Sequence, residues 1–333
     1  TGSVDLKPLA RMLPRTLQLR QGVRIDSGRL EFQAGGQPDG ERFVWQTKAA
    51  LENVSGTDGQ RRIRWEEPIE FAAELSDTDS GPQLEQLTVS SAFGQANLQT
   101  ERDAVAGEFQ LDLQQFSQEL SQFVDLQAWQ LRGLGEGTFR LTRQANQQFS
   151  AEAHADLTDL HVSDGERQIW TEPKFHVELQ VAGIEQEFQP TSLSSGKVTL
   201  RGPRDQFEVE LIEPVDLRVS EAPWRMQLEA NGPLALWASR VRPWAANVPE
   251  RLEGDAHLSA RVQVTSDALH IVESAGSIVQ LRMQNGPMSI DEPRLEFSGD
   301  AAWHRQTGRA ESREMQLLGS SFSLRGRDFV LDL

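Results

Sequence analysis

Apolar and polar residues alternate over many short runs, and this pattern constrains the fold more than any other feature of the sequence. Such runs include FHVELQVAG, KVTLRG and ARVQVTS, and Gly, Asp, Asn and Pro residues bound most of them. A period of two places successive side chains on opposite faces of a strand, so each run predicts a strand with one apolar and one polar face. Sheets of this kind are antiparallel. The sequence therefore predicts a mainly β protein with a few short helices.

Three segments change from the strand period to the helix period in the same way. GSVDLKPLARML, GEFQLDLQQFSQEL and GPLALWASRVRPW each begin with glycine, alternate briefly and then space apolar residues three or four positions apart. Their leading glycines are Gly2, Gly107 and Gly232. Each segment predicts a strand that leads directly into a short amphipathic helix, which would cap that strand.

Other landmarks recur in the same order after each of these segments. They are glycine-led runs at Gly28, Gly137 and Gly254, the pairs Glu67-Pro68, Glu172-Pro173 and Glu292-Pro293, and the paired serines Ser90-Ser91, Ser194-Ser195 and Ser320-Ser321. We therefore predict three repeats, 1–100, 101–231 and 232–333, the last of them truncated. They would form one extended folded sheet or, alternatively, an array of closed β-sandwiches, because strands alternate in both.

Composition excludes several classes of function. The 50 acidic residues outnumber the 33 basic ones, giving a net charge of −17, which predicts that the chain does not bind nucleic acid. It has no cysteine, and no apolar run is long enough to span a membrane. The first residues and the last, FVLDL, already alternate as strands do, so we expect an internal segment of a longer protein.

No arrangement of residues points to catalysis. The six histidines are scattered over strand-like sequence, without the spacing of a metal site: His154, His161, His176, His257, His270 and His304. The paired serines have no neighbouring base and no nucleophile-elbow context. We therefore expect no enzyme activity and no catalytic, metal or cofactor site. Trp65 and Trp170 stand at matching places just before a Glu-Pro pair, which predicts a repeated packing role.

Six apolar residues of the middle repeat are candidates for its dry face. They share one parity of their runs: Val177 and Leu179, Val198 and Leu200, and Val209 and Leu211. In a closed sandwich they would be core residues, whereas in an open sheet they would form an accessible apolar face.

The repeated segments resemble the AsmA-like superfamily, which includes TamB. The resemblance is carried by GSVDLKPLARMLP followed by GRLEF and by GEFQLDLQQFSQEL followed by GTFRL. The third copy departs from the pattern, with Pro233 and Trp237 where the others have ordinary strand and helix residues. The resemblance touches all three repeats and so covers most of the chain.

Membership of this superfamily implies a function in the cell envelope of didermic bacteria. It implies a periplasmic, acidic segment of a protein anchored in the inner membrane, with a β-groove that guides phospholipid acyl chains for outer-membrane biogenesis. Partners would be phospholipid and envelope proteins at either end of the parent chain. Rival hypotheses are a structural β-sandwich array that binds envelope proteins and, less favoured, a carbohydrate-active β enzyme with a converging carboxylate pair.

Overall fold

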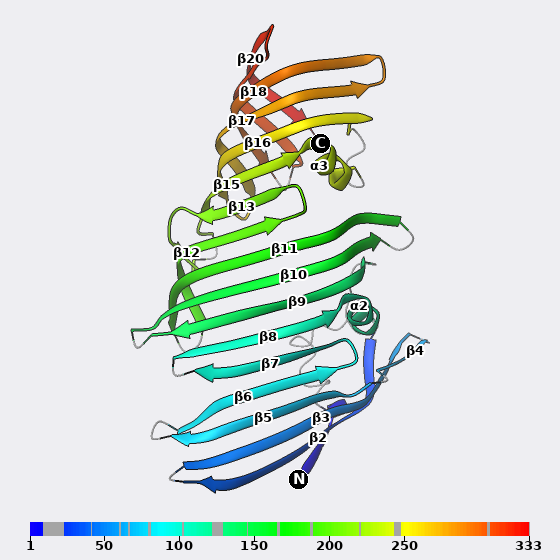
Figure 1. Cartoon of the computed structure of the whole chain (residues 1–333), viewed down its shortest axis with the longest axis vertical. Coiled ribbons are helices and arrows are strands. Elements are labelled where there is room, and N and C mark those ends of the chain that lie inside the picture. Colours follow the sequence, from blue (N-terminus) through cyan, green and yellow to red (C-terminus); the bar gives the residue numbers. More distant parts are fainter. Residues whose placement is uncertain are drawn as a thin grey trace. The chain divides into compact units, whose positions relative to one another are not determined.

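A computed structural model shows one open antiparallel sheet of 20 strands, with 79% of the chain in strands and 7% in helices (Figure 1). It describes residues 1–8, 23–40, 42–59, 61–65, 67–78, 81–101, 103–121, 129–144, 146–164, 167–186, 189–219, 221–242, 248–304 and 307–332. The prediction of a mainly β, antiparallel, extended sheet is therefore confirmed.

Each strand pairs with the next one along the chain, except where the short strands β4 and β14 lie beside longer neighbours. The first strands are β1 (Gly2–Asp5), β2 (Val23–Asp39), β3 (Arg42–Asp58), β4 (Arg61–Arg64), β5 (Ile69–Thr78), β6 (Gly81–Ser91), β7 (Gly94–Glu101), β8 (Ala104–Asp112), β9 (Trp129–Arg143) and β10 (Gln148–Asp164). The others are β11 (Arg167–Gln186), β12 (Gln189–Arg201), β13 (Gln206–Leu211), β14 (Val215–Asp216), β15 (Trp224–Pro233), β16 (Arg251–Val264), β17 (Ala268–Asn285), β18 (Met288–His304), β19 (Arg309–Leu318) and β20 (Ser323–Asp332).

Helices follow three of the strands directly. Helix α2 (Leu113–Ser121) follows β8, and α3 (Leu234–Val241) follows β15. After β1, a helical segment begins at Leu6 and is described as far as Pro8. The three changes of period that the sequence contains are therefore strand-to-helix junctions, as predicted.

The chain divides into two compact units. The N-terminal unit comprises 1–142 and 155–174, and the C-terminal unit comprises 143–154 and 175–333. Strands β10 and β11 contribute residues to both units because they are long. The first two strand-to-helix junctions belong to the N-terminal unit, and the third belongs to the C-terminal unit.

The exposed surface area is that of an open sheet and not of closed sandwiches. The chain exposes 21650 Å². A compact globular protein of 37.3 kDa exposes about 13,700 Å², and even two separate compact globules of half that mass expose only about 16,500 Å². The excess follows because one face of the sheet has no second layer against it.

Each strand-to-helix junction has a glycine bulge in the strand that pairs with the one before the helix. Asp5, Asp112 and Pro233 are the last strand residues before the helices, and they pair with Arg29, Leu134 and Asp255. The residue before each partner is Gly28, Gly133 or Gly254, with φ of 156°, 124° and 127°. These three glycines are structurally equivalent. The predicted landmark Gly137 is not among them, because it lies further along β9, opposite Phe109.

The next strand has a left-handed residue facing each bulge. These residues are Asn53, Asp159 and Gln280, with φ of 53°, 50° and 56°. The glycine is required there because a Cβ on Gly133 would lie 2.7 Å from the Thr158 carbonyl oxygen and 2.8 Å from that of Asp159. A buried apolar residue follows each left-handed residue: Val54, Leu160 and Leu281.

The junctions of the N-terminal unit enclose its two small apolar cores. Val54 and Ile63 are buried against Leu6, Leu51 and Trp65. The second core has Leu113, Leu160 and Val162 at its centre and Leu111, Leu131, Leu157 and Trp170 around them. Trp65 and Trp170 thus pack in matching places, as predicted.

Two expected equivalences need correction. Gly2, Gly107 and Gly232 all lie on the strand before a helix, but they precede Leu6, Leu113 and Leu234 by four, six and two residues. All three glycines therefore lie on the strand before a helix and on the same face of it, but at different distances from the helix. The sequence motif requires only a glycine followed by alternating residues, and several sites on the strand meet that requirement.

The Glu-Pro pairs lie at corresponding stages of the three repeats but in different surroundings. Glu172 and Glu292 are buried inside β11 and β18. Trp170 Nε1 donates to Glu172 Oε1 at 2.9 Å, and the Ser320 backbone N–H donates to Glu292 Oε1 at 2.5 Å. Glu67 instead is exposed between β4 and β5. The Glu-Pro pairs are therefore not structurally equivalent, since two lie inside strands and the first lies between strands.

Candidate apolar binding face

The six apolar residues singled out in the middle repeat lie together on one face of the C-terminal unit. Val177 pairs with Leu200, Leu179 pairs with Val198, and Val198 pairs on its other side with Val209. Leu211 lies on the same face, with its Cβ 3.7 Å from where a Cβ on Gly196 would be. All six are half-buried, which is less than the burial that a closed sandwich core would give them.

This face continues as an apolar row across nine strands, from β11 to β20. The row, which we call the first apolar row, consists of Val177, Leu200, Phe207, Ala230, Leu258, Gly276, Phe297, Leu317 and Leu324, each paired with the next. It contains no charged or polar side chain. Adjacent strands are about 4.8 Å apart, so the row is roughly 38 Å long.

A second apolar row runs beside the first over the same strands. It consists of Leu179, Val198, Val209, Leu228, Ala260, Ser274, Gly299, Met315 and Gly326. Its one polar side chain, Ser274, donates its hydroxyl to the Gly299 carbonyl oxygen at 2.8 Å. Towards β20 the face is open, since Met315 is 40% and Leu324 58% exposed. Contiguous apolar surface of this extent marks an interaction site.

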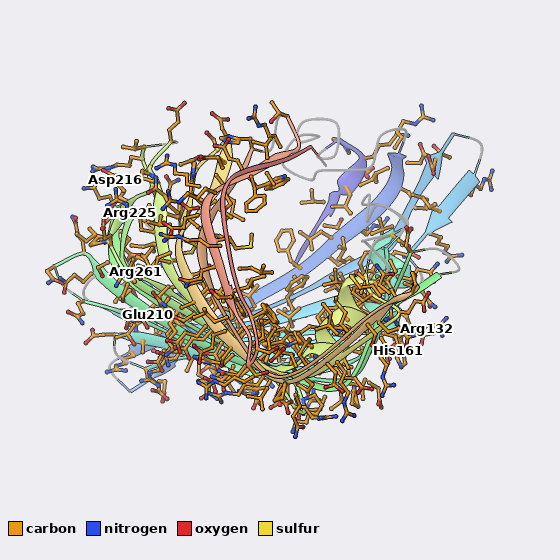
Figure 2. The ribbon with its side chains drawn as sticks, turned by 90° about the horizontal axis from the view of Figure 1, so that it is seen from above. Arg132, His161, Glu210, Asp216, Arg225 and Arg261 are labelled. Carbon is orange, nitrogen blue, oxygen red and sulfur yellow. The ribbon has the colours of Figure 1, made fainter. Side chains whose placement is uncertain are left out.

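The other face of the C-terminal unit is polar and carries ion pairs between neighbouring strands. Lys197 Nζ lies 2.5 Å from Glu208 Oε1, and an Arg201 guanidinium nitrogen lies 3.0 Å from Glu178 Oε1. Figure 2 shows Glu210, Arg225 and Arg261 on the outer side of the bent strands of this unit. The two faces therefore differ in polarity as the alternation of the sequence predicts.

The N-terminal unit has a comparable row in which large and small residues alternate. It consists of Gly2, Phe32, Ala49, Phe71, Val89, Ala96, Phe109 and Gly137. Phe32 is 41% exposed although its ring lies across Gly2, where an added Cβ would come within 2.5 Å of it.

The same aromatic-over-glycine pairing occurs with Phe139 over Gly107 and with Phe297 over Gly276. An aromatic ring covering a glycine on the next strand is a recurrent way to fix strand register. The sequence analysis did not predict these pairs, because the glycine and the phenylalanine of each pair are about 20 to 30 residues apart. A phenylalanine on the strand that follows a strand glycine was the feature that could have indicated them.

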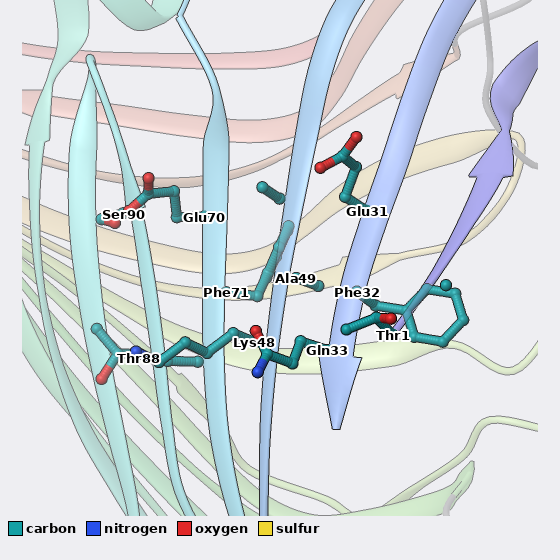
Figure 3. A pocket seen from close by; sticks show the side chains of 13 residues that line it. Thr1, Glu31, Phe32, Gln33, Lys48, Ala49, Glu70, Phe71, Thr88 and Ser90 are labelled. Carbon is teal, nitrogen blue, oxygen red and sulfur yellow. The ribbon is translucent and has the colours of Figure 1, made fainter. Parts of the chain in front are cut away.

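A cavity in the N-terminal unit is lined by Gly2, Phe32, Ala49 and Phe71 of the row described above and by polar residues of the same strands. It measures about 590 Å³ (Figure 3). Two polar-face rows line it: Glu31, Ala50, Glu70 and Ser90, and Gln33, Lys48, Ala72 and Thr88. It is shallow because alanines form its floor between longer side chains, and its charges are of both signs.

The carboxylates with shifted pKa are held in their charged form. Arg218 hydrogen bonds lower the pKa of Asp216 to about 2, and the backbone N–H groups of Glu314 and Arg313 lower the pKa of Asp300. His176 lowers the pKa of Glu178, and Arg251 lowers that of Glu253. A general acid requires a raised pKa, and no carboxylate with a resolved shift in the described part of the chain has one. Asp216, Glu178 and Glu253 serve as ion-pair partners, whereas Asp300 accepts hydrogen bonds from backbone N–H groups.

Comparison with protein-family models found no match, and comparisons with curated proteins and with solved structures found none either. Among the described residues, no helix has the length and apolar character needed to cross a membrane.

Proposed function

We propose that this chain is a non-enzymatic segment that binds phospholipid acyl chains along its apolar face and guides them from strand to strand. The observation that carries the proposal is the first apolar row, which crosses nine strands without a polar side chain. One leaflet of a bilayer has a hydrocarbon depth of about 15 Å, so a row of roughly 38 Å accommodates more than one acyl chain end to end.

Burial of methylene groups supplies the binding free energy. Each buried methylene contributes about 0.8 kcal/mol when it leaves water completely, and less on an open face. Because the two rows present similar apolar side chains from one strand to the next, the free energy of an acyl chain changes little as it moves along them. A surface of this kind suits transfer better than tight storage at one place.

Charge favours a passage for single lipids over attachment to a membrane surface. The net charge of −17 opposes adhesion to anionic bilayers, whereas single headgroups remain in water at the margin of the apolar face. The resemblance to AsmA-like proteins supports the same role and adds the expectation of a periplasmic location in outer-membrane biogenesis.

A charge placed in the second apolar row tests the proposal. Val198→Asp introduces a carboxylate between Leu179 and Val209, where it can still reach water because the face is open. We expect the variant to fold with nearly unchanged thermal stability and to lose most co-purifying phospholipid, measured by mass spectrometry of extracted lipid. Photo-crosslinking to a lipid with a diazirine in its acyl chain would measure the same loss.

Gln180→Asp is the matched control, since Gln180 is an exposed residue on the polar face of the neighbouring strand. We expect it to retain lipid. Unchanged lipid occupancy in a folded Val198→Asp protein would refute acyl-chain binding along the row. Unfolding of Val198→Asp but not of Gln180→Asp would instead show that the apolar face is a closed core in solution.

A further inference from the structure

Two histidines and a glutamate converge on the polar face of the C-terminal unit. His154 on β10 and His176 and Glu178 on β11 each offer one ligand atom, and these atoms all lie within 4.8 Å of one another. The two imidazole rings are stacked, with centroids 6.4 Å apart and an angle of 24° between their planes. All three side chains are half-buried, so each is partly positioned by its neighbours.

The contacts of Glu178 keep it charged and oriented. His176 Nε2 lies 3.0 Å from Glu178 Oε1, and the Arg201 guanidinium donates to the same oxygen at 3.0 Å. The hydrogen bond with His176 is the main cause of a lowered Glu178 pKa, followed by the nearby charge of Arg201. The carboxylate is therefore ionised at neutral pH, as a metal ligand must be.

The chemistry of these three ligands matches zinc among the common divalent ions. Zinc binds imidazole nitrogen and carboxylate oxygen at about 2.0 to 2.2 Å, and two histidines with one glutamate are an established ligand set for it. Ligand atoms around a tetrahedral zinc lie about 3.4 Å apart. The ligand atoms of His154, His176 and Glu178 are up to 4.8 Å apart, so side-chain rotations that move them by about 1 Å would bring them to this spacing. Calcium and magnesium prefer oxygen ligands alone.

We propose that His154, His176 and Glu178 form a zinc site that links β10 to β11 on the polar face. Zinc binding replaces the hydrogen bond between His176 Nε2 and Glu178 Oε1, the imidazole proton lies on the ring nitrogen that does not bind zinc, and water completes the coordination. Arg201 moves off the oxygen that zinc binds. The site lies on the face opposite the apolar rows, so it is independent of lipid binding. This assignment departs from the expectation, drawn from the sequence, of no metal site.

Calorimetric titration of the chelator-treated protein with zinc chloride tests the site. We expect binding of one zinc ion per chain. Cobalt chloride should give the visible absorption of a four-coordinate ion. His154→Gln and His176→Gln should each weaken binding by more than about 100-fold.

His257→Gln is the matched control, since His257 lies on the polar face of the same unit and hydrogen bonds to Asn231. We expect it to bind zinc as the original protein does. The proposal is overturned if the original protein does not bind zinc, or if His154→Gln binds it unchanged. Should His154→Gln fail to fold, Glu178→Gln replaces it, and unchanged binding by that folded variant also overturns the site.

Discussion

Helices α2 and α3 follow equivalent strands but are held by different chemistry. Leu113 of α2 lies in an apolar core with Leu160 and Val162. Arg240 of α3 instead forms an ion pair with Asp205, whose side chain is fully buried, while Arg240 itself is 14% exposed. The comparison shows that the glycine bulge and the first leucine define where a helix begins, whereas the contact that fixes the helix differs between repeats.

The aromatic contacts of the two helices also differ, being purely apolar at α2 and partly polar at α3. In the α2 junction, Phe116 meets Phe93 with ring centroids 5.5 Å apart, and Phe93 meets Trp65 at 5.6 Å. In the α3 junction, Trp237 lies 5.3 Å from Phe207 and also donates its indole N–H to Asp205 Oδ2 at 3.2 Å. The tryptophan that made the third copy differ from the others is thus part of a polar clamp around Asp205.

Removing the buried carboxylate should have the largest effect. Asp205→Ala leaves the Arg240 charge largely buried without its partner, and we expect a loss of about 4 kcal/mol in the free energy of unfolding. Urea denaturation followed by tryptophan fluorescence measures it. Asp216→Ala, which removes an exposed ion-paired aspartate of the same unit, should leave the midpoint unchanged. Equal effects of the two substitutions would contradict the clamp.

Truncating the apolar core at the α2 junction should have a somewhat smaller effect. Leu160 is 5% exposed, and Leu160→Ala removes its contacts and leaves a cavity, so we expect a loss of about 3 kcal/mol. Leu134→Ala is the control, because Leu134 is 59% exposed in the same unit. A loss below 1 kcal/mol, measured by urea denaturation, would show that α2 is fixed by other contacts.

Substituting the bulge glycines should reduce the free energy of unfolding by less than the changes above. The loss should be larger at Gly133, beside α2, than at Gly254, beside α3. We expect Gly133→Ala to cost about 2 to 3 kcal/mol and Gly254→Ala about 1 to 2 kcal/mol. Both have positive φ, but a Cβ would lie 2.7 Å from a carbonyl oxygen at Gly133 and 3.0 Å at Gly254. Gly35→Ala, where a Cβ meets nothing within 4 Å, is the control for thermal unfolding experiments. The reverse order would mean that the two bulges are not equivalent.

Much of the local structure could be predicted because its causes are local. The change from alternation to helical spacing identified the strand-to-helix junctions, although α2 and α3 begin a few residues earlier than that change suggests. The parity of Val177 and Leu200 placed them on one face. The matching tryptophans, Trp65 and Trp170, were correctly expected to pack. Each of these follows from side-chain periodicity within a few residues.

The candidate sites were less predictable because their members come from distant parts of the chain. His154 and His176 are 22 residues apart, and their convergence depends on how β10 and β11 pair. Asp205 and Arg240 are 35 residues apart, and nothing in either local sequence identifies the partner. Gly137 was chosen over Gly133 because a motif of glycine followed by alternation fits both.

The sequence by itself determined that the chain forms one-sided antiparallel strands, with helices at three places, since a period of two or of 3.6 is a property of adjacent residues. Tertiary structure alone decided the register that aligns Val177 with Leu324 across nine strands. A shift of one residue in any pair would exchange the two faces of a strand. The bulges at Gly28, Gly133 and Gly254 and the rings over Gly107 and Gly276 oppose such shifts, because they work only when two particular strands meet.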